Sequence, residues 1–390
     1  MRFPKICTIG LVCFLALAGP ARSEKAFSKD VGATRALLKN LCDYITVEKR
    51  DNPVMYRGAY YMRTLVAGYE IFGERRYLDI ATEYADKLLA RQLPSGYWPT
   101  GYGAIYFADT GSAIGLFIAL DRHVDEKRRQ MYFEAVRRHV EAIQADGFIS
   151  PSGGIGAGWQ HLENGQASGQ ATREYTVGSA LCGGEVFTWM YHKTHEEKYR
   201  RIALGALRWV LGTMAGDGRI PYIFEAEGTD LAKKGDYKND YLLWERIPYD
   251  TSAYVGEGVA AFDLHCDNPK WRAEIREKIQ PHIEWLLRTQ NCNGTWGIMD
   301  SHDQKRTPIL INFLSWYHRN VRPDRRVVQA IRMYDQYLLV QENAKAYGLL
   351  NRGARPGVPL HGEDQSNDTL TAMAGLAIAE MISPGIGSRW

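Results

Sequence analysis

Two kinds of apolar pattern alternate along the chain. In one kind, apolar residues recur at helical spacing between charged ones, as at Tyr77, Ala81, Tyr84 and Leu88. These segments are predicted to form half-exposed outer helices near residues 30–47, 75–91, 126–144, 196–213, 270–290 and 324–341. The other kind is almost wholly apolar and rich in Gly and Ala, which suits helices in a crowded interior. These inner helices are predicted near residues 56–72, 107–121, 175–192, 250–265, 308–320 and 367–382.

Recurring turn sequences mark the ends of the outer helices. Residues 92–98 and 290–296 both read Q-x-x-x-G-x-W, and weaker copies lie at 144–148 and 214–222. Each copy follows an amphipathic segment. Because glycine enters the left-handed backbone region without a steric penalty, it is the expected residue just after a helix.

Four inner helices begin with related sequences in which an Asp-Thr or Tyr-Thr pair precedes small residues. The first residues of these pairs are Asp109, Tyr175, Asp250 and Asp368. We interpret Asp109 and Asp368 as N-caps, because a carboxylate at a helix start accepts backbone N–H bonds. Asp250 is open to the same interpretation, but its loop also carries polar and aromatic residues that suit a site. Apart from a short piece at 220–224, the sequence has no convincing strand alternation.

Six outer and six inner helices, paired in order, predict an all-α (α/α)6 toroid, which is a ring of helical hairpins forming one domain over residues 24–390. The Q-x-x-x-G-x-W endings resemble those of the α/α-toroid superfamily, which includes terpene cyclases and pectate lyases. Residues 250–253, Asp-Thr-Ser-Ala, resemble the D-S/T-S-A helix start of unsaturated uronyl hydrolases. The resemblance covers the mature chain as architecture. It implies a carbohydrate-active toroid, similar to toroidal polysaccharide lyases and unsaturated uronyl hydrolases.

The first 23 residues have the features of a signal peptide. Arg2 and Lys5 precede an apolar run at 6–18, which is shorter than the roughly 20 residues that span a bilayer. Small residues at Ala21 and Ser23 favour cleavage near Ser23–Glu24. We therefore expect a secreted or periplasmic protein. No later stretch is apolar enough for membrane insertion.

The mature chain is close to electrically neutral. The formal charge of the whole chain is +3, and Arg2, Lys5 and Arg22 account for it. A neutral chain gives no reason to expect nucleic acid as a partner. An anionic sugar remains compatible, because a few arginines in one cleft can bind it. We expect a monomer whose partner is a polysaccharide or oligosaccharide substrate.

The cysteines and the known short motifs suggest no metal and no cofactor. Four cysteines follow the signal peptide without metal-like spacing, at Cys42, Cys182, Cys266 and Cys292. One or two disulfides or buried free thiols are both compatible with an oxidising compartment. The sequence contains no G-x-S-x-G, Walker or H-E-x-x-H motif, and neither acidic motif of the terpene cyclases.

The loops that lead into the inner helices are the predicted site. In a toroid these loops converge on one mouth, where helix N-termini favour anionic groups. His, Arg, aromatic and carboxylate residues concentrate in four of them, at 153–175, 241–250, 300–306 and 359–367. The sequence therefore predicts a carbohydrate cleft at this mouth.

The loop residues suit β-elimination from a uronate glycan. That reaction needs a group that neutralises the substrate carboxylate, a base for the C5 proton and an acid for the leaving oxygen. Arg246 with Tyr249, and Arg173 with Tyr175, are two such sets. The catalytic candidates are Tyr249, Arg246, Glu245, His161, Arg173, Tyr175, Glu185, His192 and His302. The substrate-binding candidates are Trp98, Tyr102, Trp159, Gln160, Asn164, Trp244, Asp303 and His361.

Two of these candidates lie on one inner helix rather than in a loop. Glu185 and His192 are seven residues apart and so share a helix face. Glu185 is nearer the mouth and could help to neutralise the substrate. His192 also suits a buried or helix-end histidine, which is the more common role.

We therefore hypothesise a polysaccharide lyase that acts on a uronate polymer such as an alginate-like or glucuronan-like chain. The alternative is a glycoside hydrolase acting on unsaturated uronyl oligosaccharides. Such an enzyme needs two carboxyl groups across the cleft. Carboxylates for that role are available at Asp109, Glu174, Asp250, Asp303 and Asp364. A third hypothesis is a toroid that binds glycans without cleaving them.

Overall fold

The structure of the protein is a computed structural model that describes seven stretches of the chain. These are residues 26–100, 104–163, 166–170, 174–223, 248–297, 307–343 and 363–388. The side chains of residues 160–163, 166–170, 248, 341–343, 363–367 and 388 are outside the description. The predicted signal peptide also lies outside the described residues.

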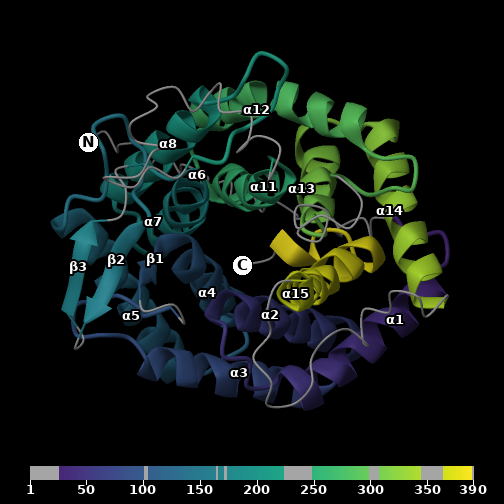
Figure 1. Ribbon diagram of the computed structural model, residues 1–390, viewed down its shortest axis with the longest axis horizontal. Coiled ribbons are helices and arrows are strands. Elements are labelled where there is room, and N and C mark those ends of the chain that lie inside the picture. Colours follow the sequence, from purple (N-terminus) through teal and green to yellow (C-terminus); the bar gives the residue numbers. More distant parts are fainter. Residues whose placement is uncertain are drawn as a thin grey trace, which may run out of the picture.

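The helices form two concentric rings, as predicted (Figure 1). The outer ring contains α1 (Val31–Tyr44), α3 (Arg75–Ala90), α5 (Glu126–Ala145), α8 (Glu197–Gly212), α12 (Pro269–Thr289) and α14 (Arg325–Asn343). The inner ring contains α2 (Met55–Phe72), α4 (Phe107–Leu120), α6 (Thr176–Gly178) continuing through a π-helical segment (Ser179–Val186) into α7 (Phe187–Thr194), α11 (Pro248–His265), α13 (Leu310–Trp316) and α15 (Glu363–Ile382). Short π-helical turns extend α1 over Ile45–Lys49 and α13 over Tyr317–Val321.

The burial of each helix explains its sequence pattern. The outer helix α3 buries one stripe, made of Tyr77, Leu78, Ala81, Tyr84, Ala85 and Leu88. The inner helix α2 is buried on every side from Met55 to Gly68, because it packs against α3 outside and against α4 and α15 within the inner ring. Glycine permits this crowding. A Cβ atom on Gly258 of α11 would lie 2.2 Å from the carbonyl oxygen of Ala180 in the neighbouring π-helical segment.

The turn motif at 290–296 ties one outer helix to the next. The side-chain amide of Gln290 donates to the carbonyl of Gly294 at 2.8 Å and to that of Ala330 in α14 at 2.9 Å. The indole N–H of Trp296 donates at 2.9 Å to Leu286, one of the last carbonyls of α12. Gln290 therefore bridges two helices, and Trp296 satisfies an acceptor at the helix end.

The copy at 92–98 repeats this geometry between α3 and α5. Gln92 donates to the carbonyls of Gly96 (2.9 Å) and Ala135 (2.7 Å), and Trp98 donates to Leu88 (2.9 Å). Gly96 has φ +90°, as the motif predicts for a helix stop. The motif is thus a structural device of the outer ring.

The ring closes where α15 meets α1 and α2. Asp368 of α15 accepts hydrogen bonds from Lys49 at 2.8 Å and from the Tyr61 hydroxyl at 2.6 Å. The N-cap interpretation of Asp368 is wrong, because α15 begins at Glu363 and Asp368 is its sixth residue. The backbone N–H of Phe27 also donates to Met381 at 2.9 Å, so the first described residues rest against the last inner helix.

A small antiparallel sheet lies outside the helical rings and was not predicted. Strands β1 (Ile105–Tyr106), β2 (Gly158–Glu163) and β3 (Gln166–Gln170) lie in the order β1-β2-β3. Trp159 pairs with Ile105 on one side and Gln170 on the other. Polar residues and glycine interrupt these strands, which read IY, GWQHLE and QASGQ, so period-two apolar alternation is weak. Conversely, the described residues of the predicted piece at 220–224 form no strand.

The four cysteines in the described residues are free thiols. Cys42, Cys182 and Cys266 are buried, and Cys292 is exposed. Burial raises the pKa of the Cys42 and Cys182 thiols well above the usual range, so both stay protonated. Within the described stretches, no helix is both long and apolar enough to cross a membrane.

Candidate functional site

Tyr175 stands at the start of α6. At the corresponding starts of α4 and α11, the inner helices on either side, the chain has Asp109 and Asp250. The Tyr175 hydroxyl lies 3.2 Å from the hydroxyl of Tyr222, and the two rings meet edge to face at 5.5 Å. Residues 221–223 are held there by Thr176, whose hydroxyl donates to the carbonyl of Pro221 at 3.0 Å and accepts from the N–H of Ile223 at 2.9 Å. The start of α6 therefore positions both tyrosines.

Asp109 and Asp250 both raise the pKa of the Tyr175 hydroxyl. The pKa of Tyr175 is raised well above its usual value, first by burial and then by the charges of Tyr222, Asp109 and Asp250. Only 7% of Tyr175 is exposed, and Asp250 is also buried. Tyr175 therefore keeps its proton at neutral pH, and its pKa senses two aspartates from the inner helices on either side.

Capping does not account for these two aspartates. In the described chain, side-chain N-caps occur on the outer helices, where Asp30, Asp125 and Asn268 accept N–H bonds at the starts of α1, α5 and α12. Asp109 and Asp250 are instead the third residues of α4 and α11. The N-cap interpretation of Asp109 is therefore wrong in position, although a first-turn carboxylate still interacts favourably with the helix dipole.

A cationic cluster lies at the start of α2, formed by Lys49, Arg57 and Asp368. Lys49 contacts the Asp368 carboxylate at 2.8 Å and Arg57 contacts it at 3.7 Å. Arg57 also donates through Nε to the hydroxyls of Tyr56 (2.9 Å) and Thr369 (3.0 Å). All three charged side chains are buried. Two cations share one carboxylate, so the cluster carries one excess positive charge and suits an anionic group.

Sequence reasoning missed Lys49 and Arg57 as functional residues. The sequence signal that could have identified them is that both basic residues lie around the start of the almost wholly apolar segment near residues 56–72. Their burial depends on contacts with α15, which lies more than 300 residues further along the chain. That contact does not appear in any local pattern.

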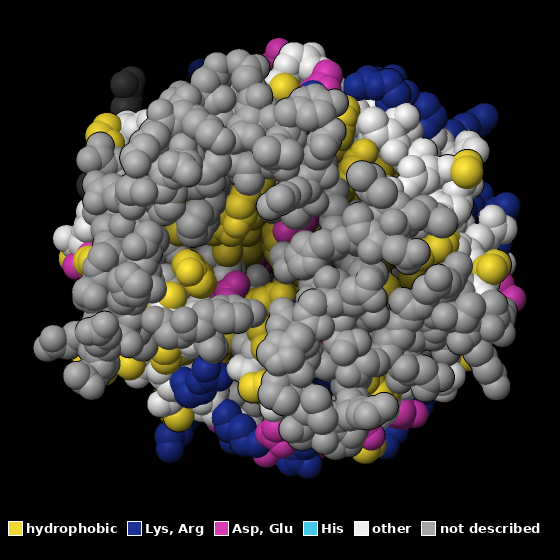
Figure 2. Space-filling view, viewed as in Figure 1, with side chains coloured by type: hydrophobic (Ala, Val, Ile, Leu, Met, Phe, Trp, Pro, Cys, Tyr) yellow, Lys and Arg dark blue, Asp and Glu magenta, His cyan; other side chains and the backbone are white. Residues whose placement is uncertain are grey.

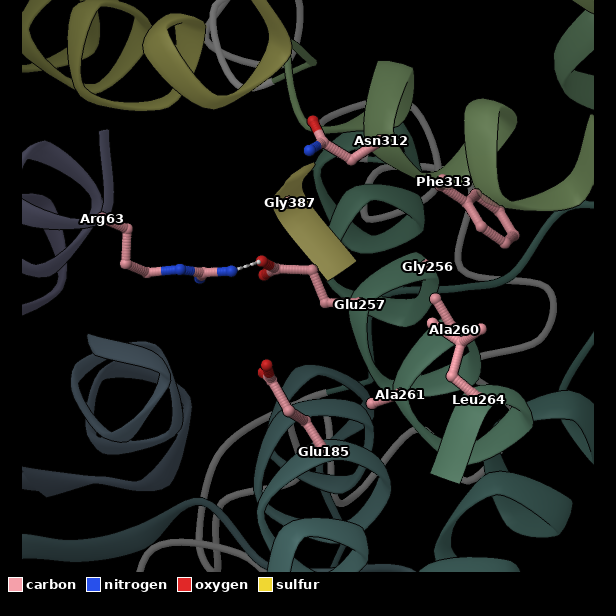
Figure 3. Close-up of a pocket in the computed structure, with 10 residues that line it drawn as sticks. All are labelled: Arg63, Glu185, Gly256, Glu257, Ala260, Ala261, Leu264, Asn312, Phe313 and Gly387. Atoms are coloured by element: carbon pink, nitrogen blue, oxygen red, sulfur yellow. Dashed lines mark ion pairs between the residues drawn. The ribbon is translucent and has the colours of Figure 1, made fainter. Parts of the chain in front are cut away.

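The centre of the molecule is hollowed when it is viewed down the ring axis. Hydrophobic and acidic side chains are visible on the walls of this hollow (Figure 2). Further along the axis, Glu185 lies beside Arg63 and Glu257 in a buried cavity (Figure 3). Glu185 follows Tyr175 by ten residues on a continuous helical segment, so the cavity lies roughly 15 Å deeper than the start of α6. Glu185 is nearer the start of its helix than His192, as predicted, and its proposed role in neutralising the substrate stays a prediction.

Two predicted residues do not belong to the mouth. Trp98 is 1% exposed and donates to Leu88, so its assignment as a sugar-binding residue is wrong. His192 lies in the last turn of α7, at the opposite end of its helix from the mouth. Its ring contacts that of His265, with the ring centres 5.1 Å apart. It is the helix-end histidine that the sequence also allowed.

Two predicted aromatic residues pack within the fold. The ring of Trp159 in β2 meets that of Phe148 edge to face at 5.1 Å. The ring of Tyr249 stacks on Trp285 of the outer helix α12, with the centres 4.7 Å apart. Both are partly buried, and their proposed contacts with substrate stay predictions.

The remaining candidates cannot be placed. The side chains of Gln160 and His161 on β2 are not described. Outside the described residues lie Tyr102, Asn164, Arg173, Trp244, Glu245, Arg246, His302, Asp303 and His361. In the stretches that are described, no cluster of His, Cys, Asp or Glu side chains is arranged to hold a metal ion.

The fold is shared with solved enzymes. No protein-family model and no curated protein matches the chain. A polysaccharide lyase is 13% identical, with a TM-score of 0.58 over 89% of this chain and 97% of its own. An unsaturated glucuronyl hydrolase from Bacillus sp. GL1 is 14% identical, with a TM-score of 0.55 over 79% of this chain and 82% of its own. A type II terpene cyclase from Scytonema is 15% identical, with a TM-score of 0.54 over 90% of this chain and 98% of its own. The protein therefore has the α/α-toroid fold of these enzymes.

Proposed function

We propose that the protein is a secreted or periplasmic lyase that cleaves a uronate-containing polysaccharide by β-elimination. The observation that carries this proposal is the position of Tyr175. Related helix starts in the ring have aspartate, but here stands a buried tyrosine whose pKa is raised by burial, by Tyr222 and by Asp109 and Asp250. A helix start does not need a tyrosine, whereas a lyase needs a proton donor at the leaving oxygen.

The proposed reaction breaks the C5–H and C4–O bonds of a uronate residue and forms a C4=C5 double bond. The raised pKa of Tyr175 keeps its proton available for the departing C4 oxygen. His161, on the strand paired with β1, is the proposed base for the C5 proton. The excess positive charge of the buried Lys49 and Arg57 would act on the substrate carboxylate through space rather than by contact, which makes the C5 proton more acidic.

The test is a panel of uronate polysaccharides incubated with the purified mature chain, with ultraviolet absorbance reporting the new double bond. We expect absorbance to rise on at least one substrate. Tyr175→Phe should lower the rate by about 100-fold or more, which is typical for loss of a general acid. Tyr222→Phe is the matched control. It removes a hydroxyl that contacts Tyr175 but does not carry the transferred proton, so its effect should be smaller. A panel without any new unsaturated product would overturn the proposal.

A hydrolase acting on unsaturated uronyl oligosaccharides is the second candidate. It is favoured by Asp109 and Asp250, two aspartates from the inner helices on either side of α6 that both raise the pKa of Tyr175. Glycoside hydrolysis uses such a pair, at a separation of roughly 5–10 Å. The glucuronyl hydrolase of the same fold gives this alternative a precedent. Here the absorbance of an unsaturated substrate would fall with time, and Asp250→Asn would abolish the change. Saturable glycan binding without turnover would instead support the non-catalytic hypothesis.

A further inference from the structure

A buried polar cavity lies on the ring axis between α2, α4, α11, α13 and the π-helical segment Ser179–Val186. Arg63 of α2 reaches across it to Glu257 of α11, with Nη2 and Oε1 2.8 Å apart (Figure 3). The hydroxyl of Tyr60 donates to the other oxygen of Glu257 at 2.5 Å. Glu185 points into the same space from the segment between α6 and α7. This group is separate from the mouth and is not used by the proposed reaction.

Three buried polar atoms that line this cavity have no hydrogen-bond partner among the described residues. They are Oε2 of Glu185, Nη1 of Arg63 and Oδ1 of Asn312. Leaving such an atom unsatisfied costs roughly 1–3 kcal/mol, and native proteins keep few of them. Only Nη1 of Arg63 and Oε2 of Glu185 border the space between α2 and α4; the first is a guanidinium donor and the second belongs to a carboxyl group. Together they match a ligand that both accepts and donates hydrogen bonds.

The cavity has two lobes that share Arg63, Glu185 and Gly387. One lobe lies against α11 and α13 and includes Ala260. The other lies between α2 and α4 and includes Gly115 and Ala119. In each lobe the centre of a water-sized sphere can occupy about 30 Å³, roughly twice what one water molecule needs.

The α2–α4 lobe has a polar end and a route to solvent. A Cβ atom on Gly115 would lie 3.1 Å from Nη1 of Arg63, so glycine leaves room beside the unsatisfied donor. The lobe ends at Glu70 and Arg122, which form an ion pair, and 38% of the Arg122 side chain is exposed. A small molecule can therefore enter from the face where the inner helices end.

The charges around the cavity favour an uncharged ligand. Arg63 and Glu257 neutralise each other, as do Arg122 and Glu70. Burial, and then the neighbouring Glu257, raise the pKa of Glu185 to about 8, although Arg63 opposes the shift. Glu185 is therefore mostly protonated at neutral pH and can both donate and accept a hydrogen bond. A cationic ligand would meet Arg63, and an anionic ligand would meet Glu257.

We propose that the α2–α4 lobe is a second ligand site, in which Glu185 and Arg63 bind a small uncharged molecule rich in hydroxyl groups. The site is independent of the reaction proposed at the mouth. Its ligand class follows from the hydrogen-bonding groups and the charge balance. Hydroxyl groups can hydrogen-bond with both Oε2 of Glu185 and Nη1 of Arg63. The apolar walls formed by Gly115 and Ala119 accommodate the carbon skeleton.

The test is calorimetric titration of the purified mature chain with erythritol and xylose as neutral probes, serinol as a cationic probe and tartrate as an anionic probe. We expect saturable binding of at least one neutral probe, and binding at least about tenfold weaker for both charged probes. Glu185→Leu should abolish binding, whereas Glu185→Gln, which keeps a donor and an acceptor, should retain it to within about tenfold.

Matched cavity-filling variants locate the site. Ala119→Leu fills the α2–α4 lobe and should abolish binding, whereas Ala260→Leu fills the other lobe and should not. Thermal melts of both variants check that they fold. Absence of saturable binding by any probe, preference for a charged probe, or equal effects of the two leucines would overturn the proposal.

Discussion

Nζ of Lys49 lies 2.8 Å from Oδ1 of Asp368, and this buried ion pair joins the first part of the chain to the last inner helix. Lys49 ends the helical segment that follows α1, and Asp368 lies in the second turn of α15. A ring of hairpins has no intrinsic end, so its closure depends on contacts between the chain's extremes. This contact is polar and nearly inaccessible to water.

Asp368→Asn should destabilise the protein by about 3–5 kcal/mol. The substitution keeps the size of the side chain but leaves Lys49 and Arg57 buried without a counter-charge. Urea unfolding of both proteins measures the difference. Asp51→Asn, which removes an exposed partner of Lys87, is the control and should change stability by less than about 1 kcal/mol. Equal small effects would show that ring closure does not rest on this pair.

Gln290→Ala should lower the free energy of unfolding by about 1–3 kcal/mol. It removes two hydrogen bonds and leaves the carbonyls of Gly294 and Ala330 without this donor. The comparison is with Gln130→Ala, where an exposed glutamine on α5 bonds only Glu134. Chemical denaturation of the two variants measures the difference. A Gln290 variant as stable as the Gln130 variant would argue against a structural role for the motif.

Gly294→Ala should destabilise the protein more than Gly73→Ala, although both glycines have positive φ. At Gly73 (φ +75°) an added Cβ meets nothing within 4 Å, so only the left-handed backbone penalty of roughly 1–2 kcal/mol applies. At Gly294 (φ +93°) the Cβ would also lie 2.4 Å from the carbonyl oxygen of Met333 in α14. The melting temperatures of the two variants rank their stabilities. A lower melting temperature for Gly73→Ala than for Gly294→Ala would contradict the close approach of the 290–296 turn to α14.

Glu185 should make the protein less stable as pH rises. Its pKa is about 8 in the folded chain against a reference value of 4.5. Between these values the folded state holds a proton that the unfolded state has released. The free energy of unfolding therefore falls with rising pH, by up to about 1.4 kcal/mol per pH unit, and levels off above about pH 8.

Glu185→Gln should remove this contribution, because glutamine stays uncharged. The variant should gain stability relative to the parent chain as pH rises from about 5 to about 8. Urea unfolding across that range measures the gap. The exposed Glu126→Gln, on the first turn of α5, is the control and should follow the parent curve. Parallel curves for Glu185→Gln and the parent would contradict a buried proton on Glu185.

The helical ring was predictable because local patterns carry it. The apolar stripe of α3 and the all-round burial of α2 both appear in the sequence as periodicity and composition. Glycines at the turns mark the helix ends by their backbone freedom alone. The β2–β3 hairpin was missed because its strands depend on main-chain bonds to each other and to β1 rather than on apolar alternation.

The site was only partly predictable. Tyr175 was a candidate because it begins a recurring helix-start sequence at the end of a polar loop, and its catalytic role stays a prediction. Trp98 was misassigned, since an aromatic residue after a turn has the same local pattern whether it binds a sugar or, as here, donates to Leu88. Lys49 and Arg57 were missed because their partners come from α15.

The sequence by itself determined the alternation of outer and inner helices, their turns and hence the toroid, because each depends on residues close together in the chain. Only the tertiary structure decided which polar groups meet. It placed Tyr222 against Tyr175, Asp368 against Lys49, and Glu185 beside Arg63. The physical reason is that burial and charge pairing arise from segments brought together by ring closure, which no local spacing encodes.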